Sequence, residues 1–239
     1  MRADEFEIAA NDSAVQAPYN RIRDDIIAGL LRPDEKLKIR DLRLRYETGS
    51  SPLREALSKL TVDGLVTRTE NRGFRVASAD ADAYEDLVQA RCWIESVALR
   101  ESIAHGTSKW EYGVVIASYD LEKSAHSLSA ERFVPNPNFE AHHKRYHMAL
   151  IGGCNNRVIE HMCSQLHDHA ARYRHLSNVK IYMTGDYQRG AEHKEISEAA
   201  LARNADRAVE LLCAHYRRTF ELLHAQTPTP ERSLTGAAV

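Results

Sequence analysis

The feature that most constrains this chain is a series of helical patterns that runs without a long break from Ala81 to residue 226. Apolar residues recur at spacings of three and four in segments 81–105, 109–128, 136–152, 156–177, 184–203 and 206–226. The connections between them, such as HGTS, GGCNN, LSNVKIY and RNAD, are short. Because short connections make successive helices antiparallel, we expect an all-α antiparallel helical bundle here.

Charge and histidine content divide the chain into two regions. Between Pro18 and Ala77 there are 13 lysines and arginines against 9 acidic residues, whereas from Ser78 onward there are 18 against 21. All 12 histidines lie at or beyond His105. The net charge of -2 therefore conceals a basic first region, which favours a nucleic-acid partner, and the boundary falls near residues 76–84.

The basic region has the elements of a small DNA-binding fold. We predict helices over 19–29, which ends on a glycine, over 39–46 and over 52–63, with Ser51 as the N-cap of the third. Two β-rich runs then flank residues 70–73, which predicts a hairpin with a basic tip. Three helices and a hairpin indicate a winged helix-turn-helix, so the fold class is mainly α.

The stretch LKIRDLRLRYETGSSPLREALSKLTVDGLVTRTENRGFRVA resembles the DNA-binding domain of the GntR superfamily of bacterial repressors. The segments that carry the resemblance are PLREAL, DGLV and RGFRV. The resemblance implies DNA contacts at Arg40, Ser50, Ser51, Arg54, Arg72 and Gly73. An arginine fork reads guanine or phosphate, and a glycine lets the wing backbone approach the duplex.

The sequence departs from the family pattern at two positions near the start of the third helix. Ser50 stands where the family commonly has arginine, and Gly49 stands where it has serine or threonine. The lost arginine implies a changed operator or weaker binding, so the base preference of the family does not transfer to this chain.

Histidines of the bundle are spaced for a shared site. His143 and His147 are four residues apart, so they differ by about 40° around a helix, whereas His142 points elsewhere. His193 and His215 lie equally far before and after the turn near Asn204, which brings them to one height when the hairpin folds. Four imidazoles suit a divalent transition metal such as zinc or nickel better than magnesium or calcium.

Other interpretations of these residues stay open. Helical histidines are often surface or core polar groups, and this is how we interpret the rest, with His161 the nearest rival ligand. A metal-dependent helical-bundle enzyme is the alternative function. A di-iron carboxylate site would use the E-x-x-H pairs at 140–143 and 221–224, and a mononuclear hydrolase would use Glu140 or Glu192 as base.

Residues 84–224 resemble the FCD ligand-binding domain of the FadR-type branch of the same superfamily, through RCWIE, HKRYH, GGCNN, EHKEI and AVELLCAHY. The resemblance implies a metal site in which His147, His193 and His215 match three histidines and His143 replaces an aspartate. It also implies a small carboxylate effector bound by Arg91. The alternative for Arg91 is an intrahelical pair with Glu95.

Together these inferences predict a metabolite-responsive repressor that acts as a homodimer on a two-fold symmetric double-stranded operator. We expect a flexible segment at 1–17, the winged helix-turn-helix at 18–78, the FCD domain at 79–227 and a disordered tail at 228–239. The acidic first residues and the lack of a long apolar run predict a cytoplasmic protein without a membrane partner.

Overall fold

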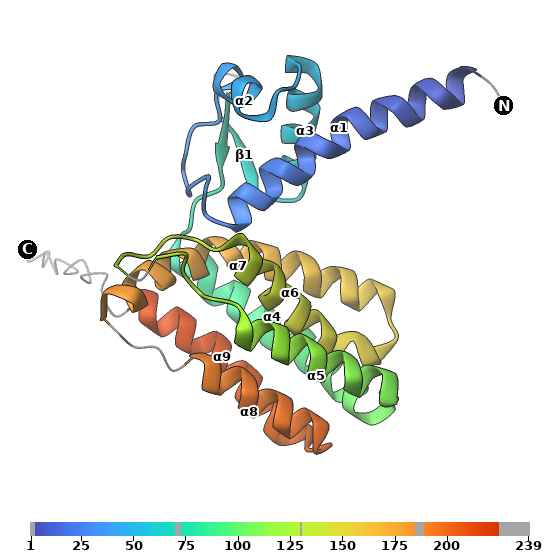
Figure 1. Cartoon of the computed structure of the whole chain (residues 1–239), viewed down its shortest axis with the longest axis vertical. Helices are drawn as coiled ribbons and strands as arrows, with labels where there is room; N and C mark the ends of the chain where they lie inside the picture. Colours follow the sequence, from blue (N-terminus) through green and yellow to red (C-terminus); the bar gives the residue numbers. More distant parts are fainter. Residues whose placement is uncertain (1–2, 70–72, 130, 185–188, 225–239) are drawn as a thin grey trace, which may run out of the picture.

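The structure, a computed structural model, describes residues 3–69, 73–129, 131–184 and 189–224. It consists of two units stacked on each other (Figure 1). The head contains α1 (Ala3–Ile27), α2 (Ile39–Tyr46), α3 (Ser50–Val62), β1 (Val66–Thr69) and β2 (Gly73–Val76). The bundle contains α4 (Ala81–His105), α5 (Ser108–Lys123), α6 (Pro137–Ile151), a 3-10 turn (Gly152–Cys154), α7 (Arg157–Thr184), α8 (Arg189–Leu201) and α9 (Ala205–His224). The predicted fold class is confirmed.

The head has its own apolar core, which explains why this basic segment folds. Ile22 and Ile26 of α1 lie against Leu53, Leu57 and Leu60 of α3, and all five are almost fully buried. Burying a leucine or isoleucine side chain contributes about 1.5–3 kcal/mol, so this set is a main source of stability for the head. The wing completes the core through Val66 and Val76, which are paired in the antiparallel hairpin.

The bundle is organised around α4, which contacts α6, α7 and α9. α4 and α6 begin at side-chain caps: Asp80 accepts a hydrogen bond from the Asp82 amide, and Asn136 accepts one from the Asn138 amide. The apolar stripes of these helices, which include Leu99, Leu150 and Leu212, form a second buried core. Because these helices pack against one another around this core, polar side chains on their inner faces come close together.

Two predictions about the head are wrong in detail. The first helix begins at Ala3 and not at Tyr19, and residues 3–17 contain no glycine or proline to stop a helix. The flexibility expected for 1–17 stays a prediction. The N-cap of α3 is Gly49 and not Ser51, because the chain is extended at Gly49 and turns into the helix directly after it. The predicted glycine end of the first helix is confirmed by Gly29, which has φ of 73°.

The bundle helices also differ from the predicted ranges. α5 ends at Lys123, five residues early, because the Ser127 hydroxyl binds the backbone of Ser129 and Val134 and stabilises a loop. α7 continues through LSNVKIY to Thr184, since this segment contains neither glycine nor proline. The predicted tail at 228–239 lies outside the described residues. Among the helices that the structure describes, none combines the length and apolarity needed to cross a membrane.

Candidate metal centre and DNA-reading surface

The four histidines that the spacing singled out converge inside the bundle. His143 and His147 come from α6, His193 from α8 and His215 from α9, and all are at least 93% buried. One ring nitrogen of each lies within 4.8 Å of those of the others. The hairpin of α8 and α9 brings its two histidines level with each other, with ring centroids 4.5 Å apart, as reflection about the turn near Asn204 predicts.

The proton on His215 is fixed by a carboxylate. The Nδ1–H of His215 donates to Oε2 of Glu192 at 2.8 Å, and Glu192 is held in turn by Arg218 at 3.0 Å. In the neutral form of this imidazole, Nε2 is the nitrogen that carries the lone pair. A carboxylate behind a histidine is the arrangement that orients metal-binding imidazoles in proteins.

The proton on His147 is fixed in the same way by a phenol. Tyr216 donates its hydroxyl proton to Glu95 at 2.5 Å, so its oxygen accepts from the Nδ1–H of His147 at 3.1 Å. Nε2 of His147 is therefore the ring nitrogen that carries the lone pair. It lies 3.1 Å from Nε2 of His143, whose Nδ1 is buried and has no hydrogen-bond partner among the described residues.

The donor set fits a divalent transition metal. Burial first, and then the neighbouring imidazoles and arginines, lower the pKa of His143 and His147 well below the usual value, so both rings are neutral and need lose no proton to bind a cation. An ion about 2.1 Å from each nitrogen would hold the nitrogens no more than about 4.2 Å apart. Small rotations of the side chains close the present spacing of up to 4.8 Å.

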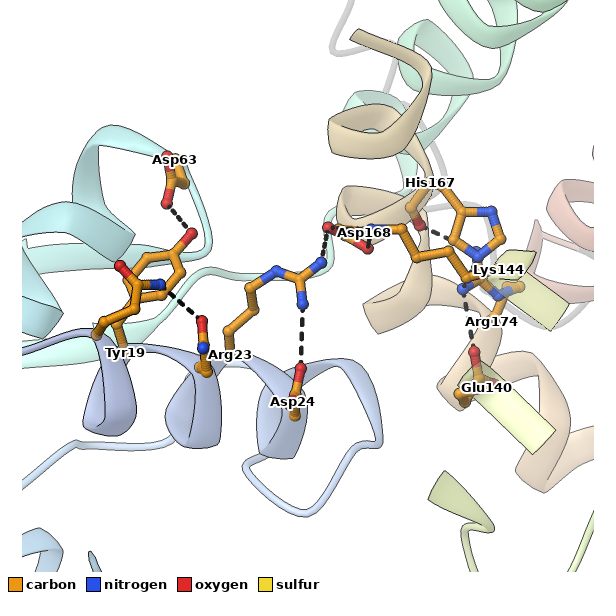
Figure 2. Close-up of polar contacts among 11 residues, drawn as sticks. Tyr19, Arg23, Asp24, Asp63, Glu140, Lys144, His167, Asp168 and Arg174 are labelled. Carbon is orange, nitrogen blue, oxygen red and sulfur yellow. Dashed lines mark hydrogen bonds and ion pairs between the residues drawn. The ribbon is translucent and has the colours of Figure 1, made fainter. Parts of the chain in front are cut away.

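A fifth histidine lies against this centre and was missed as part of it. His167 of α7 is fully buried, and its ring centroid lies 5.2 Å from that of His143 and 5.3 Å from that of His147. Arg174 donates to its Nε2 at 3.0 Å and pairs with Glu140 at 3.1 Å (Figure 2). A spacing signal existed, because His167 falls on the buried stripe formed by Cys163, Ala170 and Arg174.

Arg91, the predicted effector contact, forms the alternative interaction that the sequence left open. Its guanidinium is 3% exposed and pairs with Glu95, with Nε 2.7 Å from Oε1. Its Cζ lies 3.7 Å from the centroid of the Tyr216 ring. An external carboxylate would have to displace Glu95 to reach it, so the effector role of Arg91 stays a prediction.

The carboxylates of the enzyme alternatives have other partners. Glu140 is paired with Arg174, and Glu192 is occupied by His215 and Arg218. The side chain of His224, which the second E-x-x-H pair requires, lies outside the described part of the chain. Both oxygens of Glu192 are therefore engaged, one by His215 and one by Arg218.

The predicted DNA contacts that the structure describes lie on α2, at the start of α3 and at the start of β2. Arg40 on α2 and Arg54 on α3 are exposed, and Ser50 and Ser51 form the first turn of α3. No side chain caps this helix start, so its amide groups are available to a phosphate. Gly73 lies at the start of β2, opposite Thr69, and the wing-tip residue Arg72 falls outside the described residues.

Comparison with known families gives two matches that together span most of the chain. The bacterial regulatory proteins of the gntR family match residues 15–76, and the FCD domain matches residues 86–218. The first match covers the head from α1 to the wing, and the second covers the bundle with all four histidines.

Two curated proteins are similar over nearly their whole length. The HTH-type transcriptional repressor GlaR of Escherichia coli (strain K12) is 34% identical, over 82% of this chain and 90% of that protein. The HTH-type transcriptional regulator BphR of Paraburkholderia xenovorans (strain LB400) is 33% identical, over 90% of this chain and 87% of that protein. A solved structure of a transcriptional regulator from Rhodococcus sp. RHA1 has a TM-score of 0.73 at 22% identity, with 90% of this chain and 100% of that chain covered, and supports the fold.

Proposed function

Because this chain belongs to the GntR family of bacterial regulatory proteins and carries an FCD domain behind its DNA-reading head, we propose that it is a metal-containing, metabolite-responsive repressor. It is a transcription regulator and not an enzyme. The observation that carries the finer proposal is the meeting of four buried imidazoles, two of which have their protons fixed on the far side by Glu192 and Tyr216.

The metal is zinc or nickel. Nitrogen ligands favour these ions over magnesium and calcium, which bind oxygen. The replacement of the family's aspartate by His143 removes one negative charge, so the four side chains bring no charge to offset that of the ion. The two ions differ in coordination number: four histidines complete a tetrahedral zinc site, whereas octahedral nickel keeps two positions open to a further ligand.

The effector is a small organic carboxylate that takes such an open position or displaces a histidine. A carboxylate brings the negative charge that the four histidines lack, and its oxygens bind zinc and nickel. The relative GlaR is named a repressor, which supports repression and not activation as the role of this protein. Effector binding regulates only if the effector prefers one arrangement of head and bundle.

The protein acts as a homodimer on a two-fold symmetric operator. Tyr112, Val115, Ile116 and Tyr119 form an apolar stripe on α5, and each is at least 50% exposed. Their spacing of three and four places them on one helix face, and contiguous apolar surface of this kind marks association sites. A second copy is the occupant that a two-fold operator requires, because each half-site needs a head.

The first test separates DNA recognition from metal binding. Elemental analysis of untagged protein should find close to one zinc or nickel ion per chain. Arg54→Ala should lower affinity for a duplex selected from a random library by the wild-type protein by about 10- to 100-fold at fixed salt, because one base contact is worth about 1–3 kcal/mol. Its metal content should not change.

The matched control is Arg207→Ala, which removes an exposed arginine from α9. Equal duplex affinity of the Arg54 variant and the wild type would remove Arg54 from the reading surface. Protein that carries neither metal in stoichiometric amount would refute the metal centre and leave the DNA-binding role standing.

A second test addresses the dimer. Ile116→Asp places a charge in the middle of the α5 stripe and should reduce the mass measured by light scattering from twice 27.0 kDa to 27.0 kDa. Val158→Asp is the control, because Val158 is 69% exposed on a different helix, α7. A dimer that survives the change at Ile116 would place the interface elsewhere.

A further inference from the structure

α7 faces the metal centre and the head within a single turn. His167 points into the bundle, whereas Asp168, His169 and Arg172 contact the head. Consecutive helical residues point about 100° apart, so adjacent residues serve different sides of a rigid rod. A movement of α7 that begins at His167 is therefore delivered to the head by Asp168.

Asp168 is the centre of a three-helix ion cluster that joins the two units (Figure 2). Both of its carboxylate oxygens accept hydrogen bonds from Nζ of Lys144, at 2.7 and 2.8 Å, and Oδ2 also accepts from Arg23 of α1. Asp168 is 6% exposed, so water weakens these interactions little. One anion thus holds a cation from the head and a cation from the bundle.

A second contact beside the ion cluster fixes the distance between the units. Arg172 donates to the carbonyl oxygen of Gly64 at 3.1 Å. Gly64 has φ of 69°, and a Cβ there would lie 2.8 Å from Cε1 of His169. A side chain at Gly64 would be strained in this backbone conformation and would press against the His169 ring. The head is therefore seated directly on α7.

The residues of this junction are sequence neighbours of the histidine centre. Lys144 follows the candidate ligand His143 on α6, and Asp168 follows His167, whose ring packs against His143 and His147. α6 and α7 are in contact with each other. A change in the relative position of these two helices at the histidines changes the separation of Lys144 and Asp168 one residue away.

The two units do not fill the space between them. A groove of about 330 Å³ is lined by Val62 of the head and by Ile94, Met162 and Leu166 of the bundle. Gly64 and His169 also line this groove, so it lies directly beside the contact between Arg172 and the head.

We propose that Asp168 couples the histidine centre to the head, so that a divalent cation bound by the four histidines changes operator affinity through the Arg23–Asp168–Lys144 cluster. The inference rests on the proposed function and names its route of regulation. The coupling is reciprocal, because a cation that alters duplex affinity by a given factor has its own affinity altered by the same factor when duplex binds.

The experiment measures this factor in both directions, with zinc as the metal probe and a duplex selected by the wild-type protein as the DNA. Wild-type protein should show at least about a fivefold change in duplex affinity on addition of zinc, and the same change in zinc affinity on addition of duplex. Asp168→Asn should reduce both factors below about twofold. Its zinc affinity without DNA should stay within about threefold of wild type, since Asp168 contacts none of the four histidines.

Asp24→Asn is the matched control, because Asp24 binds the same Arg23 at 3.0 Å but is exposed and lies within the head. The Asp24 variant should show the same change in duplex affinity on addition of zinc as the wild-type protein. Asp168→Asn leaves Lys144 and Arg23 without their shared partner, so Arg23→Gln serves as a second variant that leaves the bundle untouched. Arg23→Gln should lose the coupling in the same way. If Asp168→Asn does not fold, the result for Arg23→Gln decides the test.

The inference would be overturned if a folded variant at Asp168 or Arg23 kept the wild-type change in duplex affinity on addition of zinc. So would wild-type protein that binds both zinc and duplex with no mutual effect. Failure of the proposed function has a different signature, because the wild-type protein would then bind no zinc or select no duplex at all.

Discussion

The bundle buries two polar clusters side by side, and they differ in the kinds of side chain that they bring together. In the first, Arg91 and Glu95 cancel each other's charge, and Tyr216 covers the guanidinium. In the second, four imidazoles meet with Nε2 of His147 3.1 Å from Nε2 of His143, and the carboxylate of Glu192 lies behind His215. The difference teaches that burial of polar residues does not by itself indicate a ligand site. The balance of donors, acceptors and charge does.

The largest expected effect comes from breaking the balanced cluster. Glu95→Gln leaves the buried guanidinium of Arg91 without a counter-charge, and removal of one member of a buried ion pair costs about 3 kcal/mol or more. The loss should appear in urea denaturation with a chelator present, so that no metal contributes to the free energy of unfolding.

Glu198→Gln is the matched control, because it removes the carboxylate of an exposed i, i+4 pair with Lys194 and should change stability by less than about 0.5 kcal/mol. If Glu95→Gln cost no more than this control, the Arg91 cluster would not be held by its own charges, and the contrast with the histidines would fail.

The next effect removes one member of the unbalanced cluster. His193→Ala should lower metal content and abolish the stabilisation by zinc, which is about 2.7 kcal/mol when free zinc is 100 times the dissociation constant. In chelator the variant should unfold within about 1 kcal/mol of wild type, because the cluster stabilises the fold chiefly when it holds an ion. Thermal denaturation with and without zinc measures both values.

His161→Ala is the comparison variant here, because His161 is an exposed histidine on α7 and should leave zinc stabilisation unchanged. Undiminished zinc stabilisation in the His193 variant would exclude His193 as a ligand.

The smallest effect tests the atom that joins the two clusters. Tyr216→Phe removes the hydroxyl that lies between Glu95 and His147 and leaves the ring under Arg91. Zinc affinity, measured by competition with a coloured chelator, should fall about tenfold because His147 loses the group that fixes its proton. Stability in chelator should fall by about 1 kcal/mol. An unchanged zinc affinity would mean that the clusters act independently.

Much of the fold and of the candidate centre follows from local rules. The spacing of His143 and His147 and the reflection of His193 onto His215 need only a helical repeat and one turn, and the structure places these side chains as those rules predict. Helix ends were less accurate, since α5 ends where Ser127 organises a loop that the apolar pattern does not reveal.

The sequence by itself determined a basic winged head, an all-α bundle and the height at which four histidines meet, because periodicity and short connections act over a few residues. Only the tertiary structure decided that Arg91 pairs with Glu95 and that His167 packs against His143 and His147. The same holds for the ion pair between Arg23 and Asp168, which are 145 residues apart in the sequence. Such contacts depend on how far each helix is rotated about its axis, and the packing of the whole core fixes that rotation.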